Sequence, residues 1–151
     1  MLLILGYGNP LRGDDAIGPA VLRELEHSSL AARAQFLQGQ QLGPELSEPL
    51  AASEAAIFID AAANGLPGEI RTRELHAIDG TSHGLTHQVC PETLLTLARE
   101  LYGHAPRAVL VTICGEDFAL GAPLSECAQK AIRTCLPLIA SLADKLLPAP
   151  F

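Results

Sequence analysis

Residues 3–18 read LILGYGNPLRGDDAIG, and this stretch decides how the rest of the chain is expected to fold. An apolar run breaks abruptly into glycines, a proline and two adjacent carboxylates, and an apolar pattern of helical period resumes shortly afterwards. The stretch therefore predicts a buried strand over residues 2–6 and an irregular loop. It also predicts a helix that begins at Asp15 or Gly18 and ends at Glu26.

The remainder of the chain alternates predicted strands with predicted helices. Strands are expected at 34–37, 55–60, 69–75 and 108–114, and helices from Pro44 to Ala52, from Pro91 to Tyr102, and from an N-cap at Ser125 to Leu142. We expect Pro137 to kink the last helix or divide it in two. Alternating strands and helices predict an α/β fold in a single domain of residues 1–151. Its twisted five-stranded sheet is mostly parallel, with 69–75 as an edge strand that can run antiparallel and with helices on both faces.

Composition excludes several classes of protein. The 151 residues are 48% hydrophobic and 18% charged, which is typical of a folded chain, and the net charge of −7 comes without any basic cluster. Nucleic acid and anionic membranes are therefore not expected partners. No apolar run approaches the roughly 20 residues that span a bilayer, and no signal peptide is recognised. We expect a cytoplasmic monomer whose four cysteines, which form no C-x-x-C pair, are buried or half-buried thiols.

The expected strand order brings polar side chains together. In the flavodoxin-like order 2-1-3, the first and third strands end at a switch point, where α/β proteins bind ligands. Asp15 follows the first strand, Asp60 ends the strand at 55–60, and His83 and His87 lie in a polar loop before the next helix. Two carboxylates and the imidazole of His87 form a donor set that suits a divalent ion with one position open.

Simpler roles exist for each of these residues. Asp14 or Asp15 can cap the first helix, Asp60 can accept hydrogen bonds from nearby backbone, and His87 can be an ordinary loop residue. Dinucleotide binding is disfavoured because Leu11 stands where the glycine fingerprint needs its third small residue. No G-x-S-x-G motif supports serine catalysis, and no cysteine stands beside a histidine as a nucleophile would.

Nearly the whole chain resembles the hydrogenase maturation endopeptidases, which trim the C-terminal extension of the NiFe-hydrogenase large subunit. The motifs that carry the resemblance are LGYGNPLRGDDAIG at residues 5–18, IFIDA at 57–61, THQVCP at 86–91, ICGE at 113–116 and GAPLS at 121–125. The family's metal-binding residues fall on Asp15, Asp60 and His87. One position departs from the family, because many members have Asp-Gly where this chain has Gln38-Gly39.

The resemblance implies an aspartic-type, nickel-dependent endopeptidase that acts on a hydrogenase large-subunit precursor. The nickel is presented by that precursor, other divalent ions can substitute for it, and Asp15, Asp60 and His87 contact it. Asp14 is a further catalytic candidate because it can position a water beside the site. Two rival functions use the same features: a non-catalytic nickel-sensing or chaperone module for hydrogenase assembly, and a small-molecule hydrolase on a flavodoxin-like sheet.

Overall fold

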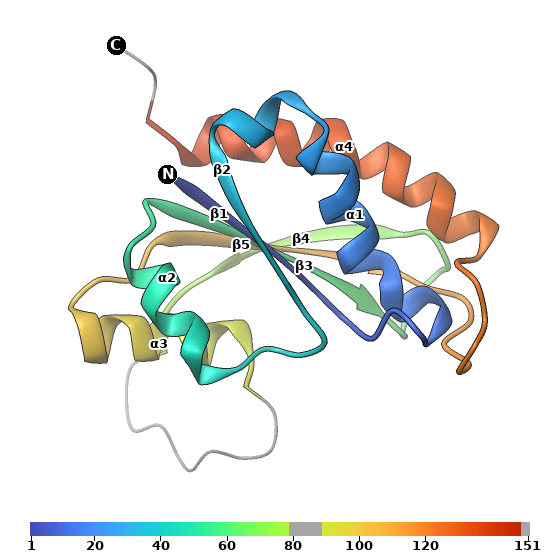
Figure 1. The fold of residues 1–151 in the computed structure, drawn as a ribbon, viewed down its shortest axis with the longest axis horizontal. Coiled ribbons are helices and arrows are strands. Elements are labelled where there is room, and N and C mark those ends of the chain that lie inside the picture. The colour runs from blue at the N-terminus through green and yellow to red at the C-terminus, as the bar shows by residue number, and fades with distance from the viewer. Residues whose placement is uncertain (79–88, 149–151) are drawn as a thin grey trace.

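The computed structural model describes residues 1–78 and 89–148, which build one five-stranded sheet with helices on both faces (Figure 1). The strand order is β2-β1-β3-β5-β4. The strands are β1 (Leu2–Tyr7), β2 (Ala34–Gly39), β3 (Ala55–Ala62), β4 (Ile70–Leu75) and β5 (Arg107–Cys114). Strand β4 pairs antiparallel with β5, whereas the other four strands are parallel. The predicted mostly parallel α/β sheet and the order 2-1-3 are confirmed.

Helices cover both faces of the sheet, as Figure 1 shows. Helices α1 (Ile17–Glu26) and α4 (Glu126–Leu146) pack on one face, and α2 (Ser47–Ala51) and α3 (Pro91–Tyr102) pack on the other. Short 3-10 turns, η1 (Gly13–Ala16), η2 (Ser29–Ala32) and η3 (Pro44–Leu46), lead into α1, β2 and α2. No helix in the described ranges is long and apolar enough to cross a membrane.

The core lies on both sides of the central strands. Leu2 and Ile4 of β1 contribute to the cluster under α1 and α4, while Leu3 and Leu5 contribute to the cluster under α2 and α3. All four side chains are at most 2% exposed. A strand buried on both faces needs apolar residues at every position, which explains the continuous apolar run at the N-terminus.

Helix α4 corrects one of the two outcomes expected of Pro137, because the proline does not divide the helix. The helix is continuous from Glu126 to Leu146. Proline removes the hydrogen bond to the carbonyl group four residues earlier, which belongs to Arg133. Both Arg133 and Pro137 are exposed, so water can satisfy that carbonyl group while the buried side of the helix stays in place.

Candidate functional site

A pocket of about 650 Å³ opens at the carboxyl ends of β1 and β3. Asp15 and Asp60 both line it, together with Tyr7 and Gly8 from the end of β1 and its loop. The opposite walls come from the segment between β2 and α2 and from the start of α3 (Gln40, Gln41, Leu42, Gly43, Pro44, Glu45, Val89, Cys90 and Pro91). The switch point of the sheet is therefore a real cavity with two carboxylates in its wall.

Asp15 is held by the loop that follows β1. Its Oδ2 accepts a hydrogen bond of 2.7 Å from the backbone N–H of Asn9. Gly8 has a φ of +147°, and a Cβ atom at that position would run into the carbonyl oxygen of Asp15. The close approach therefore needs glycine, and the half-buried carboxylate keeps further acceptor positions for a ligand.

Asp60 lies near the end of β3 in a less polar setting. Burial raises its pKa to about 6, and the negative charge of Asp15 acts in the same direction. Hydrogen bonds from the Ala61 backbone and the Tyr7 hydroxyl act in the opposite direction. The pKa of Tyr7 is in turn raised by burial and by the adjacent Asp60 carboxylate. Tyr7 therefore stays protonated and acts as a hydrogen-bond donor to Asp60 at neutral pH.

Asp14 occupies a different environment from its neighbour. Its side chain is fully buried and does not line the pocket. Its carboxylate accepts hydrogen bonds from the backbone N–H groups of Glu116 (2.7 Å), Asp117 (3.3 Å) and Ser125 (2.8 Å), and from the Ser125 hydroxyl (2.7 Å). Burial alone would raise the pKa of Asp14, but these hydrogen bonds hold it below its usual value. The carboxylate thus ties the loop after β1 to the loop between β5 and α4.

The predicted histidine ligand cannot be placed. His87 and His83 lie outside the described residues. Within residues 1–78 and 89–148, no group of three His, Cys, Asp or Glu side chains is arranged to hold a metal ion. The structure therefore brings together Asp15 and Asp60, and the third predicted ligand stays a prediction.

The pocket also contains residues that sequence reasoning did not assign. Tyr7 belongs to the opening motif, and a residue with a polar ring at the end of a strand is a usable signal for the wall of a site. Glu45 adds a third carboxylate to the pocket. It follows β2, whose carboxyl end lies at the same edge of the sheet as that of β1. Cys90 lines the pocket and is exposed, so the prediction of a buried or half-buried thiol is wrong for this cysteine. It is correct for Cys114, Cys127 and Cys135.

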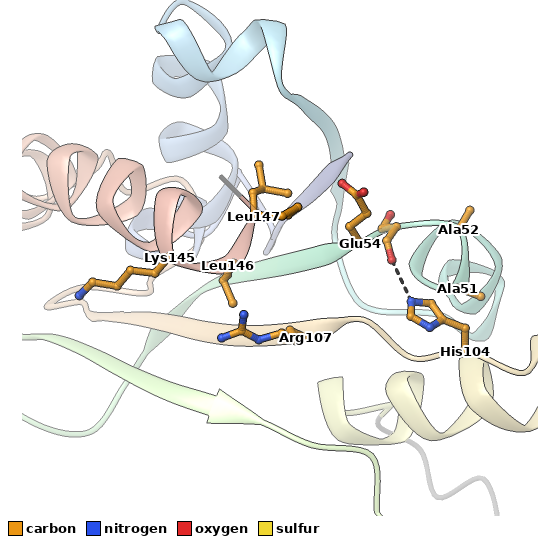
Figure 2. A pocket seen from close by; sticks show the side chains of 10 residues that line it. Ala51, Ala52, Glu54, His104, Arg107, Lys145, Leu146 and Leu147 are labelled. Carbon is orange, nitrogen blue, oxygen red and sulfur yellow. Dashed lines mark hydrogen bonds between the residues drawn. The ribbon is translucent and has the colours of Figure 1, made fainter. Parts of the chain in front are cut away.

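A second hollow, of about 790 Å³, lies at the opposite end of the sheet (Figure 2). Arg107 and Lys145 line it, and the ring of His104 is hydrogen-bonded to the Ser53 carbonyl oxygen at 3.2 Å. Its carboxylate, Glu54, is already paired with the N-terminal amino group at 2.8 Å. Because α/β sheets bind ligands at the carboxyl ends of their strands, the pocket of Asp15 and Asp60 is the better candidate site.

Comparison with known proteins identifies the fold. No protein-family model and no curated protein matches the chain. Among solved structures it is similar to the hydrogenase maturating endopeptidase HybD from E. coli, at 24% identity and a TM-score of 0.75 over 95% of this chain and 93% of that one. The NiFe-hydrogenase maturation protease HycI from Thermococcus kodakarensis KOD1 follows at 22% identity and a TM-score of 0.72, over 93% and 90% of the two chains. The hydrogenase 2 maturation peptidase from Thaumarchaeota archaeon SCGC_AB-539-E09 is 22% identical with a TM-score of 0.68, over 94% and 97%. The chain therefore has the fold of these peptidases over nearly its whole length.

Proposed function

We propose that this chain is a hydrogenase maturation endopeptidase. In this proposal it removes the C-terminal extension of a NiFe-hydrogenase large-subunit precursor after nickel has been inserted. The observation that carries the proposal is the meeting of Asp15 and Asp60 in one pocket at the switch point of the sheet. The fold shared with proteins named as maturation peptidases supports it.

Nickel enters this proposal as part of the substrate. Burial is the main cause of the raised pKa of Asp60, and the negative charge of Asp15 adds to it, so the two carboxylates repel each other when both are ionised. A cation presented by the precursor would relieve that repulsion, so the two carboxylates favour the binding of a metal ion. Two carboxylates and the imidazole of His87 form a modest donor set, so the substrate must supply the remaining ligands. Correct nickel insertion would then be a condition for productive binding.

Asp60 serves this proposal as a ligand for the cation that the precursor presents. The pKa of about 6 belongs to the metal-free site, and a cation bound to Asp60 would keep this carboxyl group ionised. The Tyr7 hydroxyl orients that carboxyl group through its hydrogen bond. Asp14 holds the loop that carries Asp15 in place and acts outside the pocket.

The test is cleavage of a nickel-loaded large-subunit precursor, followed by intact mass spectrometry. We expect loss of a C-terminal fragment with the wild type, and no loss with Asp60→Asn or His87→Ala. Asp144→Asn is the control, because this exposed carboxylate lies on α4, outside the pocket. No mass loss from a precursor with confirmed nickel would exclude the endopeptidase. Binding without cleavage would favour the nickel-sensing module.

A further inference from the structure

We propose that a small side hollow next to the pocket of Asp15 and Asp60 binds a lysine or arginine side chain of the protein substrate. The hollow has a volume of about 80 Å³, which suits a single side chain rather than a whole small-molecule ligand. Four residues line both this hollow and the 650 Å³ pocket, so the two spaces adjoin: Tyr7, Gln41, Leu42 and Glu45. The inference rests on the proposed function and names the kind of residue that the cleavage segment of the precursor carries.

The walls of the side hollow are largely apolar. Four leucines line it, namely Leu5, Leu37, Leu42 and Leu46. Leu5 and Leu42 belong to the buried core under α2 and α3, and Leu37 and Leu46 pack against that core. Lysine and arginine carry their charge at the end of a chain of methylene groups, which packs well against apolar side chains. The walls therefore suit the stem of a long cationic side chain.

Glu45 supplies a negative charge for the head of such a side chain. The residue is exposed, and within residues 1–78 and 89–148 its carboxylate has no hydrogen-bond or ion-pair partner. A Cβ atom at Gly43 would overlap both carboxylate oxygens of Glu45, so the carboxylate lies against the backbone of a residue in the pocket wall. The carboxylate is therefore available to a cationic group that the substrate brings.

The positions of the three carboxylates favour a side chain over the metal ion as the partner of Glu45. In the described part of the chain, no three His, Cys, Asp or Glu side chains are arranged to hold a metal ion, so Glu45 does not complete a metal site with Asp15 and Asp60. No described residue that lines either space is Lys or Arg. A nickel ion at Asp15 and Asp60 would leave the charge of Glu45 unmatched, and a lysine or arginine of the cleavage segment would match it.

The first test compares the wild type with Glu45→Gln, using the nickel-loaded precursor. Because this exposed side chain has no partner among the described residues, the change should leave the fold intact. Glu48→Gln is the matched control, since this exposed carboxylate lies on α2 and lines neither space. We expect the Kd of Glu45→Gln for the precursor to rise by about tenfold and kcat/KM to fall by the same factor, from the loss of a charge-assisted hydrogen bond. The control should behave as the wild type.

A charge exchange identifies the partner of Glu45. Each Lys and Arg in the cleavage segment of the precursor is replaced in turn by Glu, and each variant precursor is offered to the wild type and to Glu45→Lys. Glu45→Lys should bind the unaltered precursor more weakly than Glu45→Gln does, because like charges then meet. One of the exchanged precursors should bind Glu45→Lys more tightly than it binds the wild type.

The outcomes separate this inference from the proposed function. If the wild type cleaves the precursor and Glu45→Gln cleaves it equally well, the cation site is wrong and the endopeptidase stands. The cation site is also wrong if no exchanged precursor restores binding to Glu45→Lys. If the charge exchange restores binding but the wild type cleaves nothing, the endopeptidase is wrong and the cation site stands. A wild type that neither binds nor cleaves the precursor overturns both.

Discussion

Asp14 and Asp15 are neighbours in the chain, but their carboxylates do different work. Asp14 is buried and accepts four hydrogen bonds, whereas Asp15 is half-buried in the pocket wall and accepts one from Asn9. The 3-10 turn η1 explains the divergence, because consecutive side chains in a 3-10 helix point about 120° apart. One residue therefore secures the loop and the next is available to a ligand.

Asp14 and Asp60 should respond in opposite ways to loss of their charge. Asp14 has a lowered pKa, so its charge stabilises the fold above pH 3.8, and this contribution disappears as pH falls through the native pKa. Asp14→Asn should cost about 3 kcal/mol at neutral pH, because an amide cannot accept all these bonds. Asp60 has a raised pKa, so the metal-free protein loses stability as pH rises from 3.8 to about 6. Asp60→Asn should therefore stabilise it by about 2 kcal/mol at neutral pH.

Urea unfolding of the metal-free variants at about pH 4 and about pH 7 measures the change in the free energy of unfolding for Asp14→Asn and for Asp60→Asn, and so checks the sign of each. The gain from Asp60→Asn should be smaller at the lower pH, where the wild-type carboxyl group is already largely protonated. Asp144→Asn, at an exposed ion pair, should change stability by less than about 1 kcal/mol at either pH. A stabilising Asp14→Asn or a destabilising Asp60→Asn would contradict the assignment of one carboxylate to structure and the other to the site.

Sequence reasoning could predict the pair of Asp15 and Asp60, because Asp15 follows β1 and Asp60 lies near the end of β3, and both strands end at one edge of the sheet. The resemblance singled out Asp15 as a ligand, but the sequence did not show what Asp14 does. The partners of Asp14 lie 102 to 111 residues further along the chain, so only tertiary structure shows that its carboxylate is occupied. The placement of Tyr7 against Asp60 depends on tertiary packing in the same way.

At the scale of the elements, Gly18 lets the start of α1 pack closely against the backbone of β1 and β3. A Cβ atom at this position would lie 2.7 Å from the Tyr7 carbonyl oxygen and 2.8 Å from that of Ile59. Both atoms belong to backbone, so neither can move aside without shifting β1 or β3. Gly18→Ala should destabilise the fold by about 2 kcal/mol or more and displace the loop that carries Asp15. Thermal unfolding and cleavage of the precursor measure the two effects.

The control for Gly18 is Gly39→Ala in β2. A Cβ atom at Gly39 meets only the Gln41 carbonyl oxygen, at 3.5 Å, which is ordinary contact. The control should stay within about 0.5 kcal/mol of the wild type, as surface substitutions usually do. Equal stability of the two variants would show that the packing of α1 against β1 and β3 does not require glycine at position 18.

Elements with strong local signals were predicted well. Helix α3 begins at Pro91 and ends at Tyr102 as predicted, since proline suits the first helical turn and Gly103 adopts the left-handed conformation that ends it. The N-cap Ser125 is also confirmed, with its hydroxyl accepting from the Ala128 N–H. The local sequence could not predict that β4 pairs with β5, because this pairing depends on which edge strand of the assembled sheet has an unpaired side. The expected division of the last helix at Pro137 was wrong, because the exposure of this residue on α4 depends on tertiary packing.

At the scale of the whole molecule, one sheet separates two apolar clusters. Ile139 of α4 lies in the cluster shared with α1, and Leu94 of α3 lies in the cluster shared with α2. Strands β1, β3 and β5 contribute side chains to both clusters. The alternation of side chains along these strands therefore couples the two sides of the molecule, and neither helix layer has a core without the sheet.

This shared sheet predicts that the molecule unfolds as one unit. Ile139→Ala and Leu94→Ala remove fully buried side chains, so each should cost about 3 kcal/mol. The two sites lie on opposite faces of the sheet, so their separate costs should add nearly independently. Urea unfolding followed by circular dichroism should show a single transition for each variant, and hydrogen exchange should give α3 and α4 the same reduced opening free energy in both. If Leu94→Ala released α2 and α3 in a separate early transition, the pocket wall between β2 and α3 would be an independently folding layer.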